Sequence, residues 1–224
     1  MFVDRTDAGR RLAGELRHLR GEDPIVLALP RGGVPVAYEV ARALDAPLDL
    51  LLIRKIGAPG QPELALGAVM DGDRPETVIN EEGRRLFAVT DEELAELVAA
   101  KLAEIEQRRQ RYLAGRPRAR LDGRTVIVVD DGVATGATMR VALKAIRRAG
   151  PRRLVVAVPV APPDAVEVLK RDADEVVCLD ASDFFGGISA FYGDFRQLDD
   201  ADVVALLNRA RRPEADDAGG TERA

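Results

Sequence analysis

Val-Ile-Val-Val-Asp-Asp-Gly-Val-Ala-Thr-Gly-Ala-Thr, residues 126–138, joins an apolar run to two carboxylates and a loop of small residues. Four consecutive apolar residues, mostly β-branched, are typical of a strand that is buried on both faces of a parallel sheet. Asp130 and Asp131 therefore fall at the carboxyl end of that strand. In open α/β sheets ligands bind at this end, above all where a glycine-containing loop leads into a helix. The stretch thus predicts an α/β fold and places its ligand site.

The loop after the acidic pair has the composition of a phosphate site. Its small residues allow backbone amides to approach a ligand closely, and Thr135 and Thr138 offer hydroxyls. The helix that begins near Thr138 adds free N–H groups and the positive end of a helix dipole. The loop has neither the lysine of a Walker loop nor the three glycines of the dinucleotide fingerprint. Carboxylates bind hydroxyls but repel phosphate, so the pattern describes a ribose 5-phosphate site.

At these residues the chain resembles the type I phosphoribosyltransferases, whose signature is an apolar strand, two acidic residues and a loop ending Thr-Gly-x-Thr. The resemblance implies that Asp130 and Asp131 bind the ribose hydroxyls of phosphoribosyl pyrophosphate (PRPP), with Mg²⁺ bridging ribose and pyrophosphate oxygens there. The residues that it assigns to the 5-phosphate are Val133, Ala134, Thr135, Gly136, Ala137 and Thr138. The alternative is a surface turn after a core strand, with Asp-Asp-Gly as turn residues.

A second strand-loop-helix unit lies upstream and offers contacts for the pyrophosphate. An apolar strand over 25–29 precedes Pro30-Arg31-Gly32-Gly33, and an apolar-periodic helix follows from about 34 to 44. Arg31 is a fixed cation that suits phosphate, and Gly32 and Gly33 permit close approach of a ligand. In the family this loop holds pyrophosphate and sometimes contains a cis peptide, expected here at Arg31-Gly32 or Gly32-Gly33. The alternative is an ordinary turn with a surface arginine.

A third apolar strand is expected over 48–53, and it runs directly into Arg54, Lys55 and a loop rich in glycine and proline. Charged residues are rarely buried, so these cations should emerge at the same rim as Arg31. Adenine-type members of the family carry a similar pair, which implies further pyrophosphate contacts and a mobile flap. A solvated charge pair is the alternative. The residues expected to take part in the reaction are Asp130, Asp131, Arg31 and Lys55.

The rest of the chain alternates strands and helices, which predicts the type I phosphoribosyltransferase fold. The expected five-stranded, mostly parallel sheet has its strands at 25–29, 48–53, 124–129, 153–160 and 175–179. An insertion should hold a hairpin at 64–70 and 77–80 and a long helix from Thr90, where Glu93 completes a capping box. The domain expected over 1–212 divides into a core at about 25–180, an insertion or flap at about 56–120, and a C-terminal hood at about 181–212. Residues 213–224 are expected to be a disordered tail.

Large aromatic residues gather near the end of the chain, although aromatic content is 4% overall. In the family a hood stacks the base on an aromatic ring, so the candidates are Phe184, Phe185, Phe191 and Tyr192. These rings could equally pack a final loop onto the sheet. Ala134 stands where hypoxanthine- and guanine-type relatives have an Asp, which matches adenine-type members and weakens a 6-oxopurine assignment. The acceptor base is not identified by these observations.

Composition excludes several other classes of protein. The net charge is −5, so the basic stretch from Arg108 to Arg120 favours solvated charges over nucleic-acid binding. With one histidine, His18, and one cysteine, Cys178, neither a zinc site nor an internal disulfide is expected. The sequence shows no signal pattern and no apolar run of membrane-spanning length, so we expect a cytoplasmic protein without membrane contact.

Two functions remain open at this level. The first is the Mg²⁺-dependent transfer of a phosphoribosyl group from PRPP to a nitrogenous base, with release of pyrophosphate, in nucleotide metabolism. The second is a regulatory protein of the same fold that senses PRPP or nucleotides and binds nucleic acid through the arginines of 108–120. The acidic pair and the pyrophosphate-side cations favour catalysis. By analogy with the family, a homodimer is expected, and the long insertion helix offers a face for it.

Overall fold

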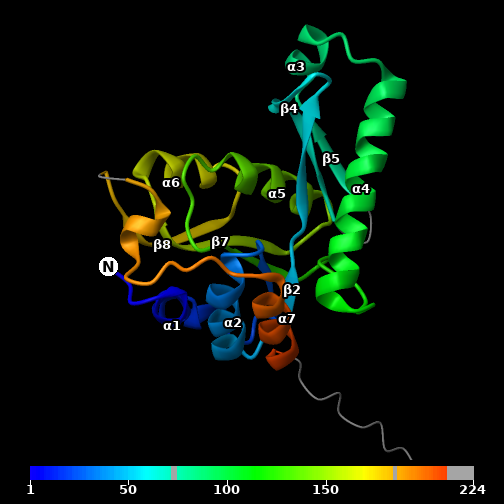
Figure 1. The fold of residues 1–224 in the computed structure, drawn as a ribbon. Helices are drawn as coiled ribbons and strands as arrows, with labels where there is room; N and C mark the ends of the chain where they lie inside the picture. The colour runs from blue at the N-terminus through cyan, green and yellow to red at the C-terminus, as the bar shows by residue number, and fades with distance from the viewer. Residues whose placement is uncertain (72–74, 184–185, 211–224) are drawn as a thin grey trace, which may run out of the picture.

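The computed structural model, which describes residues 1–71, 75–183 and 186–210, contains a five-stranded parallel sheet flanked by helices (Figure 1). The strand order is β2-β1-β6-β7-β8, and neighbouring strands pair in parallel throughout. The strands are β1 (Pro24–Ala28), β2 (Leu48–Leu50), β6 (Thr125–Val129), β7 (Arg153–Ala161) and β8 (Glu175–Ala181). Every residue of β1 and β6 is buried, as expected for strands covered on both faces. The predicted fold class is confirmed.

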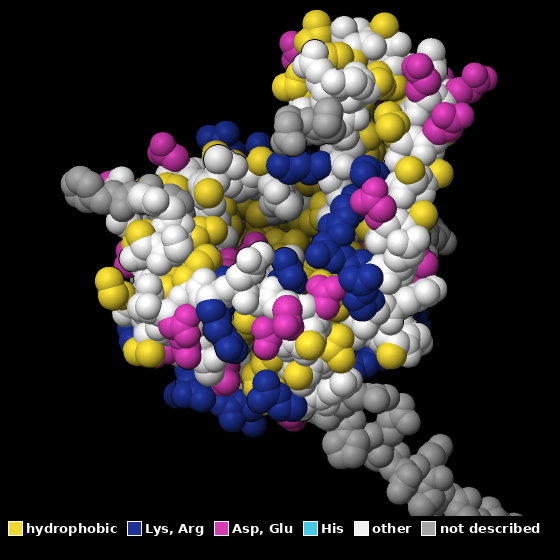
Figure 2. Space-filling model, in the orientation of Figure 1, with side chains coloured by type: hydrophobic (Ala, Val, Ile, Leu, Met, Phe, Trp, Pro, Cys, Tyr) yellow, Lys and Arg dark blue, Asp and Glu magenta, His cyan; other side chains and the backbone are white. Residues whose placement is uncertain are grey.

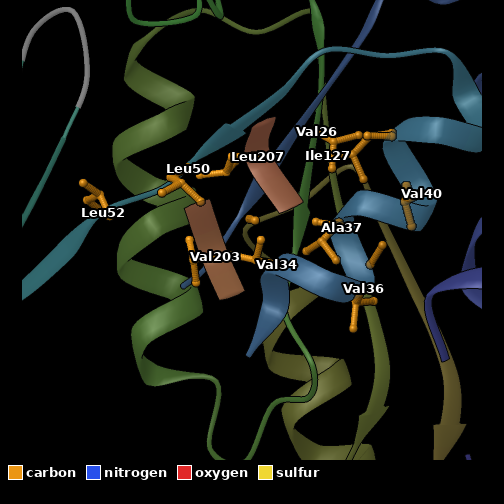
Figure 3. Packing of buried hydrophobic residues seen from close by; sticks show 14 of the residues in the cluster. Val26, Val34, Val36, Ala37, Val40, Leu50, Leu52, Ile127, Val203 and Leu207 are labelled. Carbon is orange, nitrogen blue, oxygen red and sulfur yellow. The ribbon is translucent and has the colours of Figure 1, made fainter. Parts of the chain in front are cut away.

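Helices cover both faces of this main sheet. One face carries α1 (Arg5–Glu15), α2 (Gly33–Leu44) and α7 (Asp200–Arg209), and the other carries α5 (Ala137–Arg148) and α6 (Pro163–Leu169). Alternate residues of each strand serve the two cores, because successive side chains of a strand point to opposite faces. Figure 3 shows the first core, where Val34 of α2 and Val203 of α7 pack near Val26 and Ile127. These helices hold the strand ends, and so the rim loops, in fixed positions.

A smaller antiparallel sheet forms an arm that projects from the main body (Figure 1). We call residues 53–113 the arm. Its elements are β3 (Ile53–Ala58), β4 (Gln61–Met70), β5 (Glu76–Ile79), α3 (Glu81–Leu86) and α4 (Asp91–Leu113). The predicted hairpin and the capping box of Thr90 are confirmed, since Thr90 Oγ1 accepts from the N–H of Glu93 at 3.2 Å and Glu93 Oε2 accepts from the N–H of Thr90 at 2.9 Å.

The strand predicted over 48–53 is wrong at its second half. The main-sheet strand ends at Leu50, and Leu51 and Leu52 connect it to β3 in the other sheet. Leu50, Leu51 and Leu52 are all buried. Because the apolar run continues from one sheet into the other, the sequence pattern does not reveal where the first strand ends. As a result Arg54 and Lys55 lie on a strand of the arm, and not in a loop at the rim of the main sheet.

Buried ion pairs fix the base of the arm. Arg109 of α4 lies with its Nη1 2.9 Å from Asp71 Oδ2, and Arg118 Nε lies 2.7 Å from Asp71 Oδ1. The side chains of Arg109 and Asp71 are only 7% and 4% exposed. Arg109 also lies 3.7 Å from Asp49 of β2, which belongs to the main sheet. The expectation of solvated arginines over 108–120 is therefore wrong for Arg109, which the sequence pattern could not separate from its exposed neighbours.

The N-terminal residues pair with the segment around 191–193, which follows β8 in the chain. The N–H of Phe2 donates to the carbonyl of Phe191 at 2.7 Å, and the N–H of Gly193 donates to the carbonyl of Phe2 at 2.8 Å. The short 3-10 helices η1 (Arg17–Leu19) and η2 (Ile188–Phe191) complete the elements. The predicted tail, 213–224, lies outside the described residues. Among the described helices, none combines the length and apolar character needed to cross a membrane.

Candidate functional site

Asp130, the first carboxylate of the acidic pair, and the predicted phosphate loop, residues 133–138, line one hollow at the carboxyl end of β6. Its volume is about 160 Å³. The lining residues are Asp130, Gly132, Val133, Ala134, Thr135, Gly136, Ala137, Thr138 and Met139. The structure thus brings all six predicted loop residues together with the first carboxylate of the pair.

The start of α5 gives this hollow the character of an anion site. Gly136 is the N-cap and has φ +75°, a left-handed conformation that favours glycine. Because glycine has no side chain, it cannot cap the helix, and the N–H of Ala137 donates instead to Thr135 Oγ1 over a long 3.4 Å. Ala137 and Thr138, at the first two helical positions, line the hollow. The backbone amides and the helix dipole at this point favour a bound phosphate.

The two carboxylates of the pair are held close together in a low-water environment. Asp130 Oδ1 accepts the N–H of Asp131 at 2.9 Å, and the Asp131 side chain is 11% exposed. Burial, followed by the negative charge of Asp131, raises the pKa of Asp130 well above its usual range. Burial also raises the pKa of Asp131, against the hydrogen bond and the charge of Arg5. A ligand that donates hydrogen bonds to the pair would relieve this repulsion.

The loop 30–33, between β1 and α2, lies directly against the acidic pair. A Cβ atom added to Gly32 would lie 2.0 Å from Asp131 Oδ2, and one added to Gly33 would lie 2.8 Å from the Cα of Asp130. Only glycine fits at these two positions, which explains the Gly-Gly sequence. The cis peptide lies between Pro30 and Arg31, so our prediction of its position one or two bonds later is wrong. The sequence pattern marks the loop but cannot distinguish its adjacent peptide bonds.

The predicted cations lie in three different surroundings. Arg31 is half-buried and its nearest carboxylate partner, Asp200 of α7, is 4.0 Å away. Arg54 lies 3.4 Å from Glu104 of α4, and burial together with the charge of Arg108 lowers its pKa. Lys55 is exposed, and it points to the opposite face of β3 from Arg54 because side chains alternate along a strand. Figure 2 shows a hollow between the arm and the main body, with Lys and Arg side chains along the arm side.

The aromatic residues proposed for base stacking have other surroundings or are not described. Phe184 and Phe185 lie outside the described residues. Tyr192 is 6% exposed, and its hydroxyl donates to the carbonyl oxygen of Asp131 at 2.5 Å. Its ring centroid lies 5.4 Å from that of Phe2 and 5.1 Å from that of Phe195. Tyr192 therefore supports the acidic pair from the core side, and burial raises its pKa.

Arg5, at the start of α1, belongs to the site although the sequence analysis did not select it. Its Nε donates to Asp131 Oδ2 at 2.8 Å, across 126 positions of sequence. Its Cζ lies 3.8 Å from the centroid of the Phe195 ring. The N-terminal segment contains several arginines, and periodicity alone cannot separate the one that turns inward from those that face water. A long-range ion pair of this kind leaves no local signal.

The oxygen atoms of Asp130 and Asp131 can be compared with what the Mg²⁺ ion implied by the resemblance requires. Among the residues described, no group of three His, Cys, Asp or Glu side chains is arranged to hold a metal ion. Asp130 and Asp131 supply hard oxygen donors, and Arg5 already engages one oxygen of Asp131. Such a pair fits Mg²⁺, which usually takes one or two protein carboxylates and completes its shell with water and phosphate oxygens. The residues therefore fit an ion shared with a phosphorylated ligand.

The fold and the site define an α/β protein with an acidic pair and a small-residue loop at the carboxyl edge of a parallel sheet. Residues 4–196 match the family model of the phosphoribosyl transferase domain, and the chain therefore belongs to this family. The crystal structure of TT1426 from Thermus thermophilus is 49% identical and has a TM-score of 0.80, covering 93% of this chain and 98% of that one.

Two Mycobacterium tuberculosis proteins, from strains H37Rv and CDC 1551, are also similar to this chain. Their names describe them provisionally as phosphoribosyl transferases, and each is 45% identical over 212 residues. The match covers 95% of this chain and 47% of each relative. The chain thus spans about half the length of these curated relatives.

Proposed function

We propose that the protein transfers the 5-phosphoribosyl group of PRPP to a nitrogenous base and releases pyrophosphate. The observation that carries the proposal is the order of three groups along the rim. The acidic pair lies between the phosphate loop on one side and the loop 30–33 on the other, in contact with Gly32 and Gly33. PRPP carries its 5-phosphate, ribose hydroxyls and pyrophosphate in the same order. A sugar on the carboxylates would place one charged end in each loop.

The roles of the residues follow from their chemistry. Backbone N–H groups of 134–138 would bind the 5-phosphate, with that of Ala137 leaving its 3.4 Å hydrogen bond to Thr135 Oγ1, whereas that of Val133 donates to the carbonyl of Val160. Asp130 and Asp131 would accept hydrogen bonds from the ribose hydroxyls. Arg31 and Lys55 would offset the negative charge that collects on the departing pyrophosphate, which lowers the barrier to its release. Bound Mg²⁺ supplies further neutralisation of the phosphate oxygens. The reaction needs no protein nucleophile, because binding, positioning and charge compensation suffice.

The arm supports the same proposal as a cover for the site. It borders the hollow of Figure 2 and carries Arg54 and Lys55 on β3. Closure of such a segment would exclude water while the ribose carbon is exposed to attack, so that the base and not water accepts the sugar. In this proposal the core spans about 25–180. The arm, residues 53–113, overlaps the predicted insertion of about 56–120, and the C-terminal hood spans about 181–212.

The regulatory alternative finds less support in the structure. Arg109 is buried in ion pairs, Arg118 pairs with Asp71 and Glu106, and Arg111 pairs with Asp200. These pairs neutralise much of the basic stretch that nucleic acid would need. The intact acidic pair and the loop amides are, in contrast, what a bound phosphoribosyl donor requires.

The test is release of pyrophosphate from PRPP and Mg²⁺ with each of a panel of purine and pyrimidine bases. We expect release with at least one base, and none from the double variant Asp130→Asn with Asp131→Asn. Asp164→Asn, an exposed carboxylate on α6, is the matched control and should keep full activity. No release with any base, together with salt-sensitive binding of nucleic acid, would favour the regulatory function instead.

A further inference from the structure

Arg5 is held from two sides before it reaches the acidic pair. Its side chain is 10% exposed, its Nη1 donates to the carbonyl of Arg196 at 3.0 Å, and its guanidinium lies over the ring of Phe195. Its Nε then donates to Asp131 Oδ2 at 2.8 Å. A planar group with contacts on its face and two of its edges has little freedom to move. Arg5 therefore presents a fixed donor to one oxygen of Asp131.

Asp131 contacts both Arg5 and the loop 30–33. The oxygen that accepts from Arg5 is also the atom that lies closest to the position of a Cβ on Gly32. The carbonyl of the same residue accepts the hydroxyl of Tyr192. The side chain of Asp131 is thus fixed by Arg5 from α1, and its backbone by Tyr192 from the segment after β8. Any movement of this carboxylate would change its distance to the loop 30–33.

Arg5 offsets the electrostatic repulsion between Asp130 and Asp131. Two carboxylates on adjacent residues repel each other, and the repulsion is strong where burial removes water. The groups that face them are Arg5 from α1 and Tyr192 from the C-terminal segment, and Arg5 is the cation among them. Without that cation, Asp131 would turn away from Asp130. The ribose-binding geometry would then be lost although both carboxylates were still present.

We propose that Arg5 is a positioning residue for the phosphoribosyl donor, acting through Asp131 to hold the acidic pair against the loop 30–33. This proposal rests on the proposed function, because it assigns the donor to the acidic pair. It also makes the segment 195–196, which holds Arg5, part of the support of the donor site. Arg5 itself touches neither the sugar nor the base.

The experiment measures the Kd of PRPP with Mg²⁺ by calorimetry, and the KM values for PRPP and for the base in the pyrophosphate-release assay. Arg5→Met keeps an unbranched apolar side chain near Phe195 and removes the guanidinium with its charge. We expect it to raise the Kd and KM for PRPP by about 10- to 100-fold, as for a misplaced binding group, with the KM for the base changed less than about twofold. Arg5→Lys restores the positive charge but not the planar contacts, so it should recover part of the affinity and bind PRPP more tightly than Arg5→Met does.

Arg10→Met is the matched control, since Arg10 lies on the same helix with a side chain 65% exposed, and it should bind PRPP as the wild type does. Unfolding midpoints identify any variant that fails to fold. If Arg5→Met does not fold, Phe195→Leu removes the ring beneath the guanidinium and should raise the Kd for PRPP in the same way.

The outcomes separate the two proposals. Wild type that binds no PRPP would overturn the proposed function and the role of Arg5 with it. Wild type that binds PRPP, with Arg5→Met or its substitute binding equally well, would overturn the role of Arg5 alone. An equal rise in both KM values would also overturn it, because a general loss of structure does not select the donor.

Discussion

The position of Asp130 suits ligand binding but lowers the free energy of unfolding. It lies half-buried beside a second carboxylate, and both burial and that neighbour disfavour its charge. Each unit by which the pKa of a folded carboxyl is raised costs about 1.4 kcal/mol of the free energy of unfolding at higher pH. A side chain kept in such surroundings is typical of a site that ligand binding completes.

Replacement of Asp130 by Asn should therefore raise the free energy of unfolding at pH 7 while it weakens PRPP binding. Because the folded pKa is raised, the charged form is the destabilising one. The gain should be absent near the unfolded pKa of about 3.9, grow as pH rises through the folded pKa, and then stay constant. Urea unfolding of both proteins between pH 4 and 8 measures it. A variant less stable than wild type at pH 7 would contradict the account.

Gly32 gives a second test at the scale of one residue. Gly32→Ala places a methyl group 2.0 Å from Asp131 Oδ2, so the loop or the carboxylate must move. We expect a loss of about 1–3 kcal/mol in stability and a PRPP affinity at least about tenfold weaker. In the control Gly14→Ala, a Cβ meets nothing within 4 Å in a helix, so stability should rise by about 0.5–1 kcal/mol. Equal affinities for the two variants would argue against the contact.

At the scale of elements, the arm depends on a few buried charges. Arg109 of α4 connects Asp71, at the end of β4, to Asp49 of the main sheet. Asp200 adds a second connection, because it accepts from the Tyr112 hydroxyl at 2.6 Å and begins α7. The hydrogen bonds from Tyr112 and Arg111 lower the pKa of Asp200. The arm is therefore fixed at its base.

Arg109→Met should destabilise the protein by about 3 kcal/mol, because it removes a buried cation from Asp49 and from Asp71, which keeps Arg118 as a partner. Urea unfolding measures the loss, and limited proteolysis should show earlier cleavage within the arm. Arg111→Met, which removes an exposed partner of Asp200 from the same helix, is the control and should have little effect. If the two variants unfold alike, the buried network does not anchor the arm.

How far the sequence predicts the molecule differs between elements. β1, β6 and the phosphate loop follow from local patterns, because a buried parallel strand and a small-residue loop each have a distinct composition. The junction at Leu51 and Leu52 does not, since apolar residues continue through a change of sheet. The direction of Tyr192 and the ion pair of Arg5 depend on contacts between distant segments, which composition and period do not record.

At the scale of the whole molecule, the N-terminal segment and the segment after β8 jointly support the acidic pair. Phe2 packs on Tyr192, which donates to Asp131, and Arg5 reaches the same residue from α1.

Phe2→Ala should lower the free energy of unfolding by about 3 kcal/mol, as for a buried ring. Val3→Ala, at a side chain 68% exposed, should change it little. Chemical denaturation checks both, and equal effects would contradict the assigned burial.

The close fit of Gly32 and Gly33 against Asp130 and Asp131 has a consequence for protein engineering. The two loops come from separate strand-helix units. Because they pack so closely, a different sequence in one loop would clash with the other. A donor site transplanted onto another α/β scaffold would need both loops at the same spacing, with a cation in the place of Arg5. The portable unit is therefore a pair of rim loops and one distant arginine, and not the motif of residues 126–138 by itself.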